Sequence, residues 1–232
     1  MNEQEFLARV SQRLARRSPA EAGRPQWQRP APIPAVGPED PEALAARFQE
    51  ELERLSGKCY RVASAAEVAP LIISILKANG LTGGSIVRWN DPTLEGLGLD
   101  EALTAAGFTV TPFAHGEPGR PQVELAERSV AGITGVDAAI AETGTLVMGS
   151  SRIGEAGAPG RGRTVSLLPP IHFAVVRKEH FVYTAVQVFR RLAAGPMPSQ
   201  VIFASGPSRS ADIENDLSIG VHGPGQVHVV IL

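Results

Sequence analysis

Cysteine is almost absent from this sequence of 232 residues, which contains only Cys59. A single thiol excludes an internal disulfide, and it excludes any zinc or iron–sulfur site of the CxxC type built within this chain. We therefore expect no cofactor in the chain itself, and we interpret Cys59 as a small buried apolar residue.

The sequence also lacks a large excess of positive or negative charge. The 22 basic and 24 acidic residues give a formal net charge of −2. This balance gives no electrostatic reason to expect nucleic acid or an anionic membrane surface as a partner. The hydrophobic content of 43% and the charged content of 20% are those of a globular protein.

Long apolar runs are missing as well, since none approaches the roughly 18 residues that cross a bilayer. Charged residues interrupt the apolar core that a signal peptide would need near the N-terminus. No GxGxxG follows an expected strand and no P-loop motif occurs, so neither motif-based class of nucleotide binding is supported. These absences predict a cytoplasmic protein without a membrane span.

The N-terminal 41 residues differ in composition from the rest. Over residues 2–17, Phe6, Val10 and Leu14 recur at a spacing of four, which predicts a helix that docks on the body or on another subunit. Residues 18–41 are dense in proline and predict an extended linker or a strap across the surface. We predict a helix and linker over 1–41, followed by one globular domain over 42–232.

Within this domain, helix-like and strand-like segments alternate. The apolar runs 171–176 and 227–232 are typical of strands buried on both faces. The pattern predicts an α/β fold with a central, mainly parallel sheet flanked by helices. Helices are expected near 42–56, 65–79, 99–106, 122–128, 184–193 and 210–217; strands are expected at 59–62, 85–89, 108–111, 130–134, 138–141, 145–148, 171–176, 181–183, 201–204 and 227–232.

The segment 132–146 places two acids, Asp137 and Glu142, in apolar surroundings. A buried carboxylate needs polar partners, and Thr143, Gly144 and Thr145 could supply them to Glu142 or could hold an anionic ligand. We interpret Glu142 as a candidate nucleophile or general base, and alternatively as the acceptor of backbone hydrogen bonds in a turn. Asp137 is a second candidate catalytic residue, or else a structural cap.

A second polar segment contains Ser208, Arg209, Ser210 and Asp212 ahead of the helix expected at 210–217. Free amides at a helix N-terminus together with an arginine can bind a carboxylate or phosphate. The same residues could instead only cap the helix.

Two histidines complete the set of candidate catalytic residues. His222 lies between glycines in a loop-like stretch, whereas His172 starts a strand-like run, where a lone histidine is more often a satisfied core residue than a catalytic one. Their spacing with Glu142 and Asp212 matches no metal motif, so we predict no metal site.

The glycine-rich segment 149–163 is unusually long for a loop inside a compact domain. Arg152, Arg161 and Arg163 could close over a phosphate from it. A mobile hairpin tip with solvated basic residues is the alternative.

Three motifs together resemble the LUD-domain (DUF162) family, specifically its lactate utilization protein C branch. They are TGVDAAIAETGTL at 134–146, SLLPPIH at 166–172, and GPSRSADIE at 206–214 with GVHGP at 220–224. The resemblance is strong over residues 125–232 and weaker before them. At position 210 the family more often has threonine, and Ser210 retains the hydroxyl.

This resemblance implies a fold similar to the ribose-5-phosphate isomerase and CoA-transferase superfamily. It also implies a part in bacterial oxidation of L-lactate to pyruvate. The implied partners are a cysteine-rich protein and an iron–sulfur protein with its own LUD domain, so any iron–sulfur clusters would lie in the partners.

Three hypotheses remain open from the sequence. The chain could be an accessory subunit of a lactate-oxidising system whose α/β domain binds a small anion or a phosphorylated ligand. It could be a free-standing isomerase or acyl- or CoA-transferase-like enzyme that uses Glu142. It could also be a non-catalytic assembly or regulatory module that docks partners through the 2–17 helix.

Overall fold

The computed structural model describes residues 2–13, 39–113, 120–154, 161–213, 216–220 and 222–232. The chain divides into two units, residues 1–34 and 35–232, and each is described by itself. In the first unit, the expected helix is α1 (Glu3–Arg13), and none of its residues is buried. Leu14 and most of the proline-rich linker lie outside the described residues.

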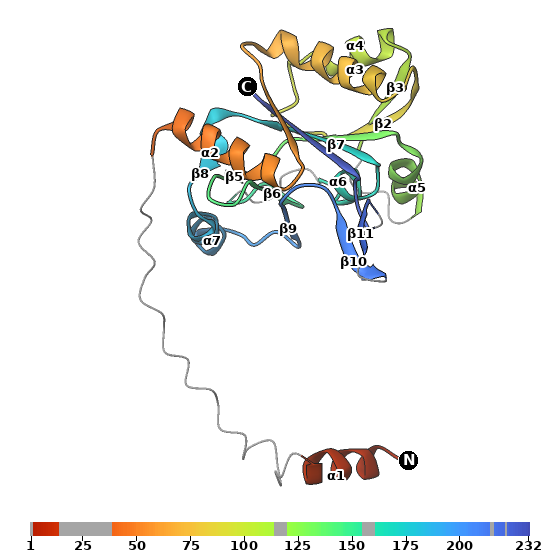
Figure 1. Ribbon diagram of the computed structural model, residues 1–232, viewed down its shortest axis with the longest axis vertical. Coiled ribbons are helices and arrows are strands. Elements are labelled where there is room, and N and C mark those ends of the chain that lie inside the picture. Colours follow the sequence, from red (N-terminus) through yellow and green to blue (C-terminus); the bar gives the residue numbers. More distant parts are fainter. Residues whose placement is uncertain (1, 14–38, 114–119, 155–160, 214–215, 221) are drawn as a thin grey trace. The chain divides into compact units, whose positions relative to one another are not determined.

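The second unit is built around a central sheet of six strands, all parallel, in the order β1-β12-β7-β4-β2-β3 (Figure 1). Every residue of β7 is buried, including His172, as its mostly apolar run predicts. The predicted α/β class with a central parallel sheet is therefore confirmed. The strands are β1 (Lys58–Arg61), β2 (Gly84–Arg88), β3 (Phe108–Pro112), β4 (Ala131–Thr134), β7 (Ile171–Val176) and β12 (Gln226–Ile231).

Helices flank this sheet, with α3 and α4 on one face and α5 and α6 on the other (Figure 1). The helix α2 adds Leu44, Phe48 and Leu52 to the same core, and the Asp40 carboxylate caps it by accepting the Ala43 amide at 2.9 Å. The bounds are α2 (Pro41–Arg54), η2 (Ala65–Glu67), α3 (Val68–Ala78), α4 (Leu99–Ala105), α5 (Arg120–Arg128) and α6 (Thr164–Leu167).

Four of the predicted strands form a separate sheet, which the sequence did not predict. Its order is β8-β5-β6-β9, with antiparallel pairs on both sides of β6. Side chains alternate between its faces, so Leu146 faces the main core while Val147 packs with Val188 of α7. The elements are β5 (Ala138–Ile140), β6 (Thr145–Gly149), η3 (Lys178–His180), β8 (Phe181–Val182), α7 (Ala185–Ala194) and β9 (Val201–Ala204).

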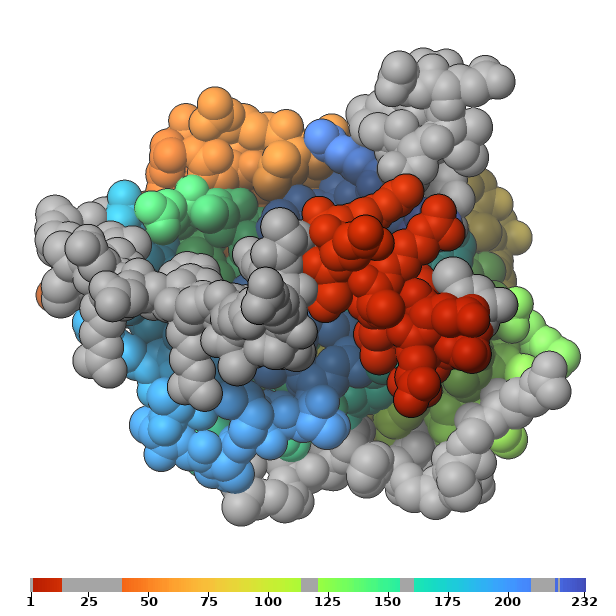
Figure 2. Space-filling model, turned by 90° about the horizontal axis from the view of Figure 1, so that it is seen from below, coloured from red at the N-terminus to blue at the C-terminus, as the bar shows by residue number. Residues whose placement is uncertain are grey.

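The outer side of this second layer is exposed. Residues of α7 and the chain after it, light blue in Figure 2, lie at the molecular surface. There Phe189 and Phe203 stack with ring centroids 5.7 Å apart. Among the described helices, none is long and apolar enough to cross a membrane.

The prediction of a helix at 210–217 is wrong. The chain there forms an antiparallel hairpin of β10 (Arg209–Ile213) and β11 (Asp216–Ile219), with Arg209 opposite Ile219. Serine and aspartate favour the cap of a helix but not its interior, and isoleucine is enriched in strands. The anion site predicted at the N-terminus of this helix therefore has no helix to form it.

Candidate functional site

Ligands of open α/β sheets bind in the crevice where the chain leaves two neighbouring strands in opposite directions, and β2 and β4 form such a position at their carboxyl ends. These neighbouring strands run parallel, but from β2 the chain continues to β3 on one side, and from β4 it continues towards β7 on the other. Such a change of direction leaves room between the two outgoing loops, and ligands of open α/β sheets bind there. The topology alone therefore marks this position as the candidate site.

Each of the two strands delivers a carboxylate to the crevice three residues after its end, Asp91 from β2 and Asp137 from β4. The Arg161 guanidinium lies between them: Nη1 is 2.8 Å from Asp137 Oδ1, and Nη2 pairs with Asp91 Oδ2. All three side chains are at most 3% exposed. A buried guanidinium is stable only when it is paired and hydrogen-bonded in this way.

The two carboxylates also hold backbone in place. Asp137 accepts the Gly149 amide at 2.7 Å and the Ile153 amide at 3.3 Å, so it anchors the start of the 149–163 segment. Asp91 accepts the Thr93 amide at 2.8 Å. Gly135 lets the two loops meet, because a Cβ there would lie 3.0 Å from Thr93 Cβ.

An aromatic ring packs against the buried arginine. The Arg161 guanidinium lies over the Trp89 ring at 4.9 Å, and Trp89 Nε1 donates to the Gly162 carbonyl at 2.9 Å. Burial acts to raise the pKa of Asp91, but the charge of Arg161, the hydrogen bonds from Thr93 and the charge of Arg152 outweigh it and lower that pKa. Asp91 is therefore ionised at neutral pH.

Further polar groups come from the carboxyl end of β7. Arg177 Nη2 donates to the Thr93 carbonyl at 3.3 Å, and His180 Nδ1 accepts the Arg177 amide at 3.2 Å. Burial lowers the pKa of His180; among its charged neighbours, Glu179, Asp137 and Asp91 act to raise it and Arg152 to lower it. The imidazole is therefore neutral at pH 7, with its proton on Nε2 because Nδ1 is an acceptor.

Glu142 lies elsewhere, exposed in the turn between β5 and β6, at the opposite end of this hairpin from Asp137. The turn packs on α2: Gly144 has φ 61°, and a Cβ there would lie 2.8 Å from Leu52 Cα. In this turn Thr143 Oγ1 and Thr145 Oγ1 are 2.7 Å apart, so the two hydroxyl groups hydrogen-bond to each other.

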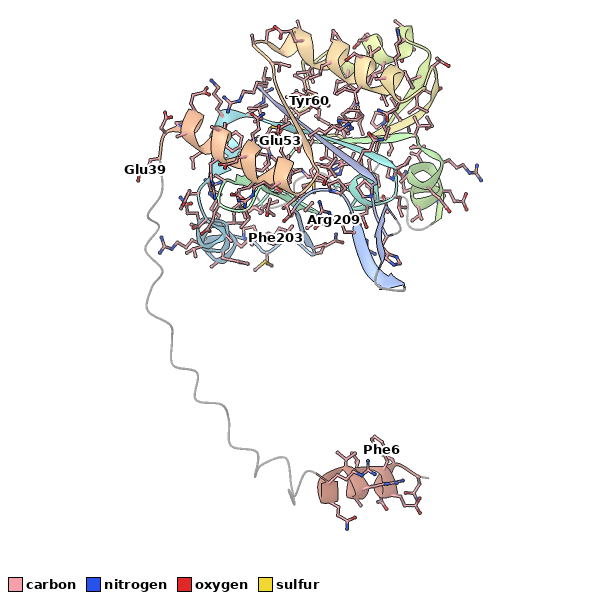
Figure 3. The ribbon with its side chains drawn as sticks, in the orientation of Figure 1. Phe6, Glu39, Glu53, Tyr60, Phe203 and Arg209 are labelled. Atoms are coloured by element: carbon pink, nitrogen blue, oxygen red, sulfur yellow. The ribbon has the colours of Figure 1, made fainter. Side chains whose placement is uncertain are left out.

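The second predicted segment reaches the same end of α2. Thr145 Oγ1 is 2.7 Å from Ser205 Oγ, and Arg209 donates to Ser56 Oγ at 2.8 Å, just after α2 (Figure 3). The Ser208 amide donates to the Pro224 carbonyl at 3.0 Å. His222, two residues before Pro224, is exposed and lies in a bend. The side chains of Ser210 and Asp212, both in β10, lie outside the described part.

His172 lies inside the core on β7. Its Nε2 is 2.9 Å from Thr134 Oγ1, and burial, with a smaller effect of His228, lowers its pKa to about 4. The turn with Thr143 and Thr145 and the segment with Arg209 thus both contact the end of α2, whereas Asp137 and His172 have other partners. No three His, Cys, Asp or Glu side chains gather into a possible metal site within the described ranges.

Sequence reasoning missed Asp91, Arg177 and His180, and it did not connect Arg152 or Arg161 with Asp137. A signal was present, because Asp91, Asp137, Arg177 and His180 each follow a predicted strand within four residues. In a parallel sheet these positions meet at one edge. Arg163 differs from its two neighbours, since it is exposed and donates to Gln200 Oε1 at 3.0 Å.

Comparison with known proteins gives relatives along nearly the whole chain. Lactate utilization protein C of Anoxybacillus flavithermus is 31% identical over 98% of this chain and 97% of its own length. The Geobacillus sp. protein of the same name is 30% identical over 100% and 95%, and that of Bacillus subtilis is 34% identical over 65% and 63%.

The fold also matches a crystal structure of a DUF162 family protein from Deinococcus radiodurans. The TM-score is 0.54 at 24% identity, covering 84% of this chain and 99% of that one. The LUD domain family model matches residues 45–232, which include all the crevice residues named above. The chain therefore belongs to the LUD domain family, as the resemblance of its motifs predicted.

Proposed function

We propose that this chain acts in the oxidation of L-lactate to pyruvate, as a subunit or accessory of a system and not as an independent enzyme. The observation that carries the proposal is the likeness, along nearly its full length, to proteins called lactate utilization protein C. At the coarser level these relatives give the chain a role in lactate utilization.

The electron balance of the reaction supports the need for partners. Conversion of L-lactate to pyruvate releases two electrons and two protons, which an acceptor must take up. Cysteine-ligated clusters use about four thiolates, and this chain has one cysteine. An iron–sulfur LUD-domain protein and a cysteine-rich protein are the acceptor partners we propose.

The ligand site that we propose is the crevice between β2 and β4, and the ligand is a small anion. The cationic side chains Arg152 and Arg161 of the 149–163 segment and Arg177 at the end of β7 lie at this position. Glu142, the sequence-based candidate for covalent or acid–base chemistry, is exposed on a turn at the far end of the β5–β6 hairpin. This placement favours the crevice over the turn as the ligand site.

Deletion of the gene in the organism that encodes the chain tests the function. Growth on L-lactate as the sole carbon source should be lost, while growth on pyruvate should be unchanged. A plasmid copy should restore growth on L-lactate. Unimpaired growth of the deletion strain on L-lactate would refute the proposal, and turnover of L-lactate by the purified chain with a soluble dye acceptor alone would refute the accessory role.

A role in assembly is a second candidate function, because α1 presents an unburied apolar face. Phe6 is 50% exposed and Leu7 is 55% exposed, and Val10 follows one turn later. Phe6→Ser combined with Val10→Ser should remove co-purification of the partners while leaving the melting temperature of the chain unchanged. Retained co-purification would exclude α1 as the docking element.

A further inference from the structure

A row of three rings crosses the edge of the central sheet, from Phe173 on β7 through His228 on β12 to Tyr60 on the edge strand β1. His228 is buried and stacks on both neighbours, with its ring centroid 5.1 Å from that of Phe173 and 5.9 Å from that of Tyr60. Tyr60 is only half-buried (Figure 3). It is therefore the ring of this row that a small molecule can reach.

Tyr60 lines a pocket of about 440 Å³ between the end of β1 and the first turn of α3, which we call the Tyr60 pocket. This volume is in the range of small-molecule sites. The two charged residues of the pocket already have partners, since Arg61 donates to Glu42 Oε2 at 2.8 Å and Glu67 accepts two local hydrogen bonds. The other walls are apolar and consist of Val62, Ala66, Pro70 and Leu71.

A chain of hydrogen bonds behind Tyr60 fixes the direction of its hydroxyl proton. The chain starts at the Ile75 carbonyl, which can only accept, so Asn79 presents Nδ2 to it at 2.8 Å and Oδ1 to Gln226. Gln226 donates Nε2 to that oxygen at 2.8 Å, and its own Oε1 lies 3.0 Å from His228 Nε2. His228 therefore carries its proton on Nε2.

The other ring nitrogen of His228 accepts the Tyr60 proton. Burial, with a smaller effect of the Lys58 charge, lowers the pKa of His228 to about 4, so the imidazole is neutral at pH 7 and Nδ1 has no proton. Burial, with a smaller effect of Cys59, raises the pKa of Tyr60, so its hydroxyl stays protonated and donates to Nδ1 at 3.2 Å. The lone pairs that remain on Tyr60 Oη can only accept.

We propose that the Tyr60 pocket binds a flat ring compound that carries an O–H or N–H donor, with the ring on the apolar walls and the donor on Tyr60 Oη. Aromatic rings pack well on one another and on apolar side chains, so a ligand ring matches Tyr60 and its neighbours. The committed proton of Tyr60 selects a donor over an ether or a carboxylate, which can only accept. The pocket belongs to β1 and α3, so this inference goes beyond the proposed function and does not rest on it.

NMR titration of the full chain with two pairs of probes tests the assignment. Indole and benzofuran have rings of the same size, but only indole has an N–H; 2-naphthol and 2-methoxynaphthalene form the corresponding pair for O–H. The donor probe should bind about fivefold more tightly than its partner, which is the effect of one hydrogen bond. A preference in one pair alone supports the inference and identifies N–H or O–H as the donor.

Three variants locate the binding. Tyr60→Phe keeps the ring and removes the oxygen, so it should abolish the preference for the donor probes while benzofuran still binds. Tyr183→Phe is the matched control, because Tyr183 is the other tyrosine of the chain and lines no part of the pocket; the preference should persist there. Ala66→Trp, at an exposed position of the pocket wall, should fill the pocket and abolish binding of all four probes.

His228 gives a spectroscopic readout of the proposed contact. A donor on Tyr60 Oη polarises its O–H and strengthens the hydrogen bond to His228, so the Nδ1 resonance should shift more with indole than with benzofuran. Equal affinities within both probe pairs, a preference that survives Tyr60→Phe, or no binding of any probe would each overturn the inference. Ala66→Trp leaves the hydrogen bond between Tyr60 and His228 in place, so binding that survives this change overturns the inference even if Tyr60→Phe fails to fold.

Discussion

Arg161 places a full positive charge inside the domain, between two carboxylates that are equally buried. Removing one partner from such a cluster leaves the others uncompensated in a medium of low polarity. We expect Arg161→Met to lower the free energy of unfolding by about 3–5 kcal/mol. Urea denaturation followed by circular dichroism measures this loss.

Arg163→Met provides the comparison at the same loop. Its guanidinium is exposed, with Gln200 as its hydrogen-bond partner. Arg163→Met should therefore change the free energy of unfolding by no more than about 0.5 kcal/mol. If the two substitutions destabilise the domain equally, the buried cluster is not what holds this segment.

His172 and His228 predict a dependence of stability on pH. Burial is the main cause that lowers the pKa of each to about 4, from the 6.5 of an unperturbed imidazole. Because the folded pKa is the lower one, the unfolded chain takes up protons first as the pH falls. The contribution of each neutral histidine to the free energy of unfolding is complete above pH 6.5 and is lost between pH 6.5 and 4. This loss is at most about 3 kcal/mol for each histidine.

Urea denaturation at pH 7 and pH 5 measures this loss, and NMR titration of the two imidazoles assigns it. His228→Gln should make the unfolding free energy less dependent on pH over this range. An unfolding free energy that is flat from pH 7 to pH 5 would contradict the burial of neutral histidines.

Only part of the site could be predicted at the level of single residues. Asp137 was recognised because an acid among apolar residues needs partners. Those partners, Arg161 and the amides of Gly149 and Ile153, follow 12 to 24 residues later. Their meeting depends on how β6 turns back on β5, which no local pattern specifies.

At the level of elements, the end of α2 joins two segments that are far away in sequence. Gly144 faces the helix backbone at φ 61°. Gly144→Ala should destabilise the domain by more than 2 kcal/mol, because the Cβ adds a clash with Leu52 to about 1–2 kcal/mol of left-handed strain. Thermal and urea denaturation measure the change.

Gly154→Ala is the matched control. Gly154 also has a positive φ, 88°, but nothing lies within 4 Å of the position of its Cβ. It should therefore show the strain alone. Equal losses at the two positions would mean that the turn does not press on α2.

The strands β7 and β12 of the central sheet were predictable because their runs are mostly apolar and rich in β-branched residues. The hairpin of β10 and β11 was not, since its polar residues suit a helix cap as well as a strand. The separate sheet of β5, β6, β8 and β9 was also missed. Its short strands differ from those of the central sheet only in their neighbours, which the sequence pattern does not specify.

For the whole molecule, the division into residues 1–34 and 35–232 predicts independence of the larger unit. Removal of residues 1–34 should leave its melting temperature unchanged within about 2 °C, because α1 buries no residue. Differential scanning calorimetry of both chains measures this. A truncated chain that binds a hydrophobic dye and melts without cooperativity would contradict the division.

The edge strand β1 has one partner among the described strands, β12, which follows it by on the order of 160 residues. A ribosome that adds about 5–20 residues per second needs roughly ten to thirty seconds to make the chain between them. Throughout that time β1 lacks β12, the strand that will pair with it. Among the described strands of the central sheet, β1 is therefore the one to which a chaperone that binds unpaired strands can bind for the longest time during synthesis.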